Sequence, residues 1–133
     1  MKLKGMKLVL TRKKHFSPSG FLSELVSIKY RDTPFKLHTY FVKINTGFKR
    51  ARHYHVKKEE WITPVCGKTL LVMKNIKTKK KKEYLLDSEA KTHKIIHIPS
   101  GWAHSVKSVG GSSAVVVFTP KADDQTDSFF YEI

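Results

Sequence analysis

Two histidines separated by a single residue, His53 and His55, precede Glu60 and are followed much later by His104. Side chains at positions i and i+2 of a β-strand project from the same face, so the two imidazoles should point together. Segment 56–59 is expected to form the turn that returns Glu60 to the histidine pair. Three or four nitrogen and oxygen ligands of this kind suit a divalent metal such as zinc or iron. Without a metal, the same groups form an acid/base cluster.

A frame of turn residues surrounds these four side chains. Residues 47–67 read Gly-x5-His-x-His-x4-Glu-x6-Gly, and residues 99–104 read Pro-x-Gly-x2-His. Both patterns resemble the two sequence motifs of the cupin superfamily, whose members are small double-stranded β-helix barrels. The resemblance implies an all-β, cupin-type jelly roll. The metal ligands that it implies are His53, His55, Glu60 and His104.

Length and composition indicate one globular domain over residues 1–133, with a basic N-terminal segment and first strand over residues 1–15. Hydrophobic residues make up 40% of the chain. No apolar run approaches the roughly 20 residues that cross a bilayer, so no membrane insertion is expected. Lysines interrupt every apolar run near the start, which makes a cytoplasmic protein the default expectation. The single cysteine, Cys66, excludes an intrachain disulfide and is expected to be a small buried hydrophobe.

The net charge of +15 would attract any anion, including nucleic acid, membrane headgroups and nucleotide diphosphates. The lysine run over residues 77–82 lies between two apolar stretches and is expected to be a solvated hairpin loop. The sequence contains no helix-turn-helix pattern, zinc-finger spacing or aromatic RNA-binding signature. We therefore expect no specific nucleic-acid partner.

Almost every apolar segment is short, rich in β-branched or aromatic residues, and bounded by turn residues. This pattern predicts many short strands in a closed sandwich or barrel, and no stretch keeps a helical period over three turns. The expected strands cover residues 7–12, 22–30, 37–44, 53–57, 61–65, 68–76, 83–86, 94–98, 103–109, 114–119 and 129–133. A barrel of this size has room for side chains or one modest ligand.

A finer resemblance is carried by the segment Arg50-Ala51-Arg52-His53-Tyr54-His55. It resembles the Arg-Gly-x-His core of dTDP-4-dehydrorhamnose 3,5-epimerases and of dTDP-4-keto-6-deoxyglucose 3,4-ketoisomerases. Segments 20–24 and 98–104 also resemble stretches of the epimerases. The His-Tyr-His-x4-Glu pattern and the ending 127–133 are similar to the C-terminal cupin domain of capsular polysaccharide epimerase-reductases. These cupins act on nucleotide sugars, and cupins of this size often pair through edge strands, which implies a homodimer.

The resemblance implies an enzyme that epimerises or isomerises a 4-keto-6-deoxyhexose by proton transfer alpha to the ketone, for surface polysaccharide synthesis. By position, Arg50 would hold an oxyanion or phosphate and His53 would be the base. Tyr40 matches a pocket tyrosine that would serve as acid or orienter, although a core aromatic is an equal interpretation. The substrate-binding residues that the resemblance implies or allows are Glu24, Arg52 and Trp102.

His53 presents a conflict, because one imidazole nitrogen cannot both bind a metal and act as a free base. The presence of all four donors favours a divalent metal, zinc first, with iron, manganese or nickel as alternatives, while a metal-free site stays open. The other functions left open are a metal-dependent cupin of different chemistry, such as an oxygenase, and a cupin that binds without catalysing.

Several residues depart from the epimerase pattern or are expected to lie in solvent. Ser17 and Ser19 replace the Asp and Arg of the early epimerase segment, where that Arg contacts the nucleotide. Lys57 and Lys58 are expected at a turn tip that faces water. The acidic residues expected in a solvated loop near the C-terminus are Asp123, Asp124 and Asp127.

Overall fold

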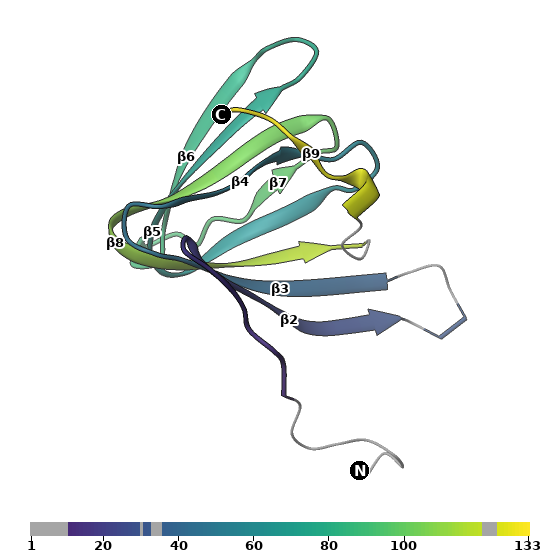
Figure 1. Cartoon of the computed structure of the whole chain (residues 1–133), viewed down its shortest axis with the longest axis horizontal. Helices are drawn as coiled ribbons and strands as arrows, with labels where there is room; N and C mark the ends of the chain where they lie inside the picture. The colour runs from purple at the N-terminus through teal and green to yellow at the C-terminus, as the bar shows by residue number, and fades with distance from the viewer. Residues whose placement is uncertain (1–10, 30, 33–35, 121–124) are drawn as a thin grey trace.

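The structure, a computed structural model, describes residues 11–29, 31–32, 36–120 and 125–133 (Figure 1). Within these ranges the fold consists almost entirely of β-strands, and the single helical element is a three-residue 3-10 turn, so no helix there could cross a membrane. The elements are β1 His15–Ser17, β2 Gly20–Lys29, β3 Lys36–Ile44, β4 Lys49–Tyr54, β5 Glu60–Asn75, β6 Lys81–Asp87, β7 Ile96–Ile98, β8 Trp102–Thr119, η1 Gln125–Asp127 and β9 Phe129–Phe130.

One nine-stranded sheet curls into two facing layers because its two longest strands, β5 and β8, take part in both. In the first layer, the C-terminal half of β8 pairs with β3 on one side and with the N-terminal half of β5 on the other. In the second layer, the N-terminal half of β8 pairs with β4 and with the C-terminal half of β5. Strands β1, β2 and β7 extend the first layer, and β6 and β9 extend the second. All pairings are antiparallel, as a jelly roll requires.

The bend in β5 depends on Gly67. The pairing of β5 with β8 shifts register on both sides of Cys66, which marks a β-bulge, and Gly67 has a φ of 68°. A Cβ atom at Gly67 would lie 2.6 Å from the backbone oxygen of Ser112 on β8, so only glycine fits. Cys66 is exposed at this corner. The prediction that its side chain is buried was wrong, because the bulge interrupts the alternation of inward and outward side chains and turns Cys66 toward solvent.

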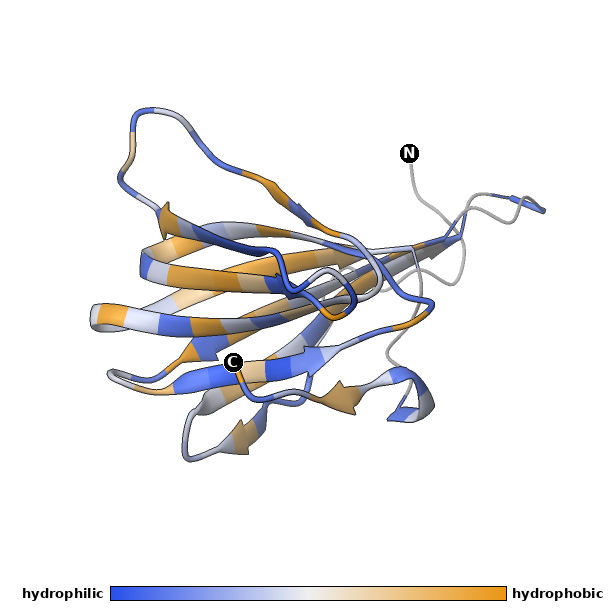
Figure 2. Ribbon diagram, turned by 90° about the horizontal axis from the view of Figure 1, so that it is seen from above, coloured by the Kyte–Doolittle hydropathy of each residue, from blue (hydrophilic) through white to orange (hydrophobic). Residues whose placement is uncertain are grey.

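Aliphatic side chains from both layers fill the space between them. Along β3, Tyr40, Val42 and Ile44 are buried at every second position, as expected for a strand with one face on the core. Figure 2 shows the same alternation of apolar and polar residues along the longer strands. The core cluster consists of Val42, Ile44, Ile62, Leu71, Met73, Leu86, Ile98, Val106 and Val115.

The all-β fold is confirmed, but several strand boundaries differ from those expected. The expected pairs 61–65 with 68–76, and 103–109 with 114–119, are single strands, because a bulge or a glycine bends the chain without interrupting the pairing. The strand expected at 53–57 is Lys49–Tyr54 instead. The last strand ends at Phe130.

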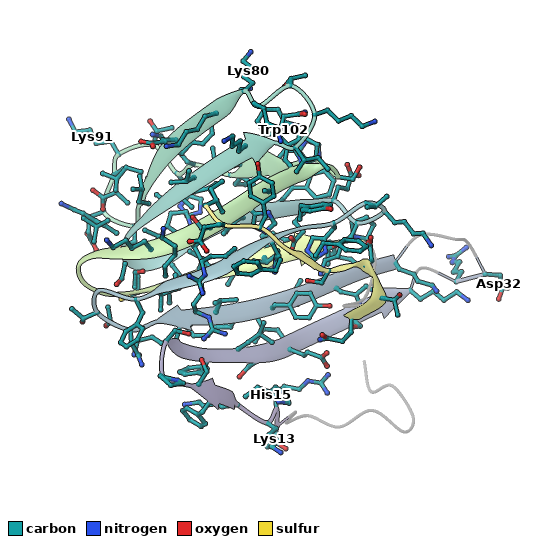
Figure 3. The ribbon with its side chains drawn as sticks, turned by 45° about the horizontal axis from the view of Figure 1, so that its top comes forward. Lys13, His15, Asp32, Lys80, Lys91 and Trp102 are labelled. Carbon is teal, nitrogen blue, oxygen red and sulfur yellow. The ribbon has the colours of Figure 1, made fainter. Side chains whose placement is uncertain are left out.

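The remaining differences lie at the edges of the sheet. Most of the strand expected at 7–12 lies outside the described residues, and Thr11 and Arg12 are not in a strand. On β2 the expected alternation is broken by a register shift between Glu24 and Ser27. The tip of the β5–β6 hairpin, where Figure 3 labels Lys80, is exposed at the edge of the molecule.

We expect Gly67→Ala to lower the free energy of unfolding by about 3 kcal/mol. The alanine would have to adopt a left-handed backbone conformation, and its Cβ would also collide with β8, so the two costs add. Gly47→Ala is the matched control: its φ is 79°, but no atom lies within 4 Å of the added Cβ. The control should lose only about 1 kcal/mol. Urea denaturation of both variants measures the difference, and equal losses would show that the corner tolerates a side chain.

Candidate functional site

Four side chains that are distant in sequence meet between the two layers. His53 lies on β4, His55 directly after it, Glu60 at the start of β5 and His104 on β8. Each offers one donor atom, and these atoms all lie within 4.8 Å of one another. The ring centroids of His53 lie 4.6 Å from His55 and 4.7 Å from His104. The arrangement is a compact group of three nitrogens and one carboxylate oxygen.

A bulge in β4 aims two of the predicted residues at the same space. Ala51 and Arg52 have φ angles of 69° and 56°, and the pairing of β4 with β8 shifts register between Ala51 and His53. Arg50 and His53 are three positions apart, so on a regular strand they would face opposite sides. The bulge reverses this parity, and both side chains line one cavity.

The imidazoles of His55 and His104 are held by backbone carbonyls. Nδ1 of His55 donates to the carbonyl oxygen of Asp127 at 2.6 Å, and Nδ1 of His104 donates to that of Trp102 at 3.3 Å. A carbonyl oxygen only accepts, so each hydrogen bond places the proton on Nδ1 and leaves Nε2 as the inward-facing nitrogen. Those two Nε2 atoms lie 3.3 Å and 3.4 Å from Oε1 of Glu60.

The donor atoms of this group fit a divalent metal. Nε2 of His55 and Oε1 of Glu60 are buried without a hydrogen-bond partner within the described part of the chain. Buried polar atoms are almost always satisfied, so two such atoms facing each other call for an additional group between them. Metal-binding histidines commonly donate their second ring N–H to a carbonyl or carboxylate, as His55 and His104 do.

The protonation states of the group are coupled. Burial would raise the pKa of Glu60, but the facing imidazoles of His104 and His55 and the nearby Lys58 hold that pKa well below its usual value. Burial lowers the pKa of His53 to about 3, helped by the neighbouring His104 and His55. Burial opposes a charge on His55 as well, but the facing carboxylate of Glu60 and the hydrogen bond to the carbonyl of Asp127 outweigh burial and raise its pKa. The carboxylate is therefore ionised, and His53 is neutral at physiological pH.

A cavity of about 320 Å³ opens beside the four donors. The polar part of its lining consists of the four donors together with Tyr40, Arg50 and Lys58. The rest of the lining is mostly apolar and includes Leu22, Val42, Ile62, Ile98, Val106 and Val115. Mostly apolar walls with a few convergent polar groups are typical of small-molecule sites.

Lys58 belongs to this cavity, contrary to the sequence prediction. It was expected at a turn tip in water, yet it is only 6% exposed. Its ammonium lies 3.7 Å from Oε2 of Glu60 and 5.4 Å from the centre of the Tyr40 ring. The turn curls inward because its backbone is held from the other side by Asp127, which the pattern of charges along the sequence does not reveal.

Asp127 is the second residue that the sequence analysis misplaced. It was expected in a solvated loop, but it is 4% exposed. Its carboxylate accepts hydrogen bonds from the backbone N–H groups of Val56, Lys57 and Lys58. Burial would raise the pKa of Asp127, but these donors and the nearby His55 outweigh burial and lower it. Asp123 and Asp124 lie outside the described residues.

Arg50 reaches the cavity with its guanidinium already anchored. Nη1 of Arg50 donates to the hydroxyls of Ser17 at 2.8 Å and Ser19 at 2.9 Å, and burial lowers the pKa of Arg50. These are the two serines that depart from the epimerase pattern. Here they orient Arg50, which nothing in their sequence context indicated.

The three predicted substrate-binding residues do not line the cavity. Glu24 is exposed on β2 opposite Tyr40. Arg52 points outward to Phe130 and Glu132 of the C-terminal segment. Trp102, labelled in Figure 3, packs against the core, and Lys82 lies 5.5 Å from its ring centre. The role of all three in binding a substrate stays a prediction.

Comparisons with known proteins connect this geometry to a family. The family described as "Polysaccharide biosynthesis C-terminal domain" matches residues 17–127. Capsular polysaccharide assembling protein CapF from Staphylococcus aureus superposes with a TM-score of 0.81 at 18% identity, over 95% of this chain and 33% of CapF. Oxalate decarboxylase from Bacillus subtilis superposes with a TM-score of 0.72 at 16% identity, over 90% of this chain and 30% of that enzyme. No curated protein matches the sequence.

These likenesses confirm the cupin-type jelly roll. At such low identity a solved structure shows the fold alone. The chain spans about a third of the length of each of these proteins, so the activity of the whole proteins is not transferred by the superposition.

Zinc titrated into chelator-treated protein should bind at one ion per chain, and His104→Ala should weaken binding by at least about 100-fold, more than a change beyond the direct ligands usually causes. The control is His97→Ala, because His97 pairs with Glu59 on the outside, at 2.9 Å. Competition with a chromophoric chelator measures both affinities. Equal weakening by the two substitutions would place the metal elsewhere.

Proposed function

This chain belongs to the family of polysaccharide biosynthesis C-terminal domains, and from that membership we propose that its cavity is an enzyme site for a nucleotide sugar. The reaction is epimerisation or isomerisation of a 4-keto-6-deoxyhexose by proton transfer next to the ketone. The observation that carries the proposal is the convergence of four metal-binding donors, an anchored arginine and a buried tyrosine on one cavity. The oxygen atoms of a keto sugar suit the polar groups of the lining, and the methyl group of a 6-deoxy sugar suits its apolar side chains.

The residues that would hold a divalent ion are His53, His55, Glu60 and His104. Zinc suits three imidazoles and one carboxylate, and iron, manganese and nickel accept the same donors. When bound, such an ion supplies a Lewis acid that polarises the ketone. Because all four donor atoms lie within 4.8 Å of one another, we assign His53 to the ion rather than to the proton transfer.

Arg50 is the group that meets negative charge on the substrate. When water in the cavity accepts a proton from the carbon next to the ketone, the electron pair of the broken C–H bond moves onto the ketone oxygen, so an enolate forms. A guanidinium is always charged and presents several N–H donors in one plane, which suits an enolate or a phosphate oxygen. The hydrogen bonds from Arg50 to Ser17 and Ser19 fix its orientation before substrate binds, so little reorganisation is needed.

Tyr40 is the group that we assign to proton return. It lies on β3, is almost fully buried and lines the cavity with the four donors. A proton returned to the opposite face of the same carbon gives the epimer, whereas a proton delivered to the former carbonyl carbon moves the ketone. The ammonium of Lys58 lies 5.4 Å from the centre of the Tyr40 ring. After Tyr40 has given its proton to the carbon, the phenolate recovers a proton from the water that accepted the first one.

The cavity volume limits which part of the substrate it encloses. About 320 Å³ is at the lower end for ligand pockets. A hexose ring fits in such a space, whereas the nucleotide must lie outside it. With a net charge of +15, the protein surface attracts a diphosphate-bearing ligand.

Incubated in D2O with dTDP-4-keto-6-deoxyglucose, the zinc-loaded protein should introduce deuterium at a carbon next to the ketone, as seen by mass spectrometry and proton NMR. Binding of the sugar nucleotide without exchange would instead identify a binding module. Oxygen consumption with the iron-loaded protein and no exchange would identify an oxygenase. Either outcome would contradict the proposed reaction.

Tyr40→Phe should lower the exchange rate by about 100-fold or more, the usual contribution of a positioned acid or base, while zinc affinity stays unchanged. Tyr84→Phe is the control, because Tyr84 packs against the core from β6 and does not line the cavity. Exchange rates and zinc affinities of the two variants are compared side by side. Full exchange by Tyr40→Phe would remove the tyrosine from the mechanism.

A further inference from the structure

The C-terminal segment reaches the turn between two of the four donors through Asp127. Its carbonyl oxygen accepts the Nδ1 proton of His55 at 2.6 Å across 72 positions of sequence. Its carboxylate accepts the N–H groups of Val56 at 2.9 Å, Lys57 at 3.1 and 3.2 Å, and Lys58 at 3.0 Å. Asp127 therefore binds a histidine of the site and the backbone that follows it.

The turn that Asp127 holds is the short connection between two of the four donors. Residues 56–59 are all that separates His55 from Glu60, and three of their N–H groups point at one carboxylate. Charge-assisted hydrogen bonds to a carboxylate are roughly twice as strong as neutral ones, and the residue that accepts them here, Asp127, is buried. Fixing this turn fixes the distance and direction from His55 to Glu60.

We infer that Asp127 is a positioning residue of the metal centre, which orients His55 by its carbonyl and sets the spacing of His55 and Glu60 by its carboxylate. The inference rests on the proposed metal site. The part of it that concerns the orientation of the His55 imidazole applies to the metal-free protein as well. Partners of this kind around a metal ligand typically change metal affinity by about 10–100-fold.

Asp127 is held in place by neighbouring contacts of the same segment. Phe129 stacks on Tyr54 with 5.2 Å between ring centres, and Tyr131 N–H donates to the carbonyl of Arg52 at 2.9 Å. Gln125 and Ser128 line the cavity. The segment 125–132 is thus a strap alongside β4 at one side of the site, and Asp127 is its contact with the turn after His55.

Asp127→Ala removes the carboxylate and frees the turn, whereas Asp127→Asn keeps an oxygen for part of the N–H groups but turns an amide donor toward the others. The matched control is Glu132→Ala, which removes an exposed carboxylate of the same strap that lies 4.0 Å from Arg52. If the alanine variant does not fold, the asparagine variant carries the test, because it is nearly isosteric.

The first measurement uses the metal-free, 15N-labelled protein. The Nδ1 proton of His55, identified by its loss in His55→Gln, should give a slowly exchanging NMR signal in the wild type and in Glu132→Ala. Asp127→Ala keeps the main-chain carbonyl but loses the carboxylate that holds the turn after His55, so His55 should move relative to that carbonyl and the signal should broaden or disappear. An unchanged signal in the Asp127 variants would overturn the inference, whatever the metal does.

The second measurement is zinc affinity by chelator competition, with the visible spectrum of the cobalt-loaded protein as a report on ligand geometry. Affinity should fall about 10–100-fold in Asp127→Ala, less in Asp127→Asn, and not at all in Glu132→Ala. A loss of thermal stability with unchanged zinc affinity and cobalt spectrum would show that Asp127 only stabilises the fold, and would overturn the inference. If the wild type binds no metal while the His55 signal depends on Asp127, the proposed metal site fails but the orientation of His55 by Asp127 stands.

Discussion

A carboxylate buried among imidazoles is the constraint on which this structure depends. Glu60 is enclosed between His55 and His104, and moving an ionised carboxylate out of water without partners is strongly unfavourable. Lys58 compensates one oxygen, and the other faces two nitrogens across a gap that a cation would fill. A buried carboxylate is tolerated only if its partners stay in place. The elements around Glu60 hold those partners in position.

Three devices maintain that geometry. The bends of β5 and β8 bring Glu60 and His104 into facing layers, with Gly67 at the corner. The bulge at Ala51 and Arg52 turns β4 so that Arg50 and His53 share the cavity. The C-terminal strap holds the turn after His55. The first two devices are departures from regular strand geometry, and departures of this kind are frequent next to functional sites.

The positive charge of the protein is divided between two settings. Most of it lies on exposed lysines, such as those of the β5–β6 hairpin, where water screens it. Two cations, Arg50 and Lys58, line the cavity instead, where the low dielectric strengthens their fields. Because Lys58 is paired with Glu60, Arg50 is the cation of this lining that an anionic ligand would meet. This fits the sugar nucleotide proposed for a family whose description is polysaccharide biosynthesis.

The sequence by itself determined the all-β fold, because period-2 hydrophobicity and turn residues are local properties of the chain. The cupin type and the four donors followed from the resemblance of two of its motifs to those of cupins. It did not place Lys58 or Asp127, both assigned to solvent, since the charge of a residue does not tell which distant backbone will accept or donate to it. Nor did it show Arg50 resting on Ser17 and Ser19, or the outward position of Cys66. Those outcomes arise from bulges and from a strap 72 residues away from His55. Only the tertiary structure decides them, because a one-residue shift in strand parity reverses every side chain that follows.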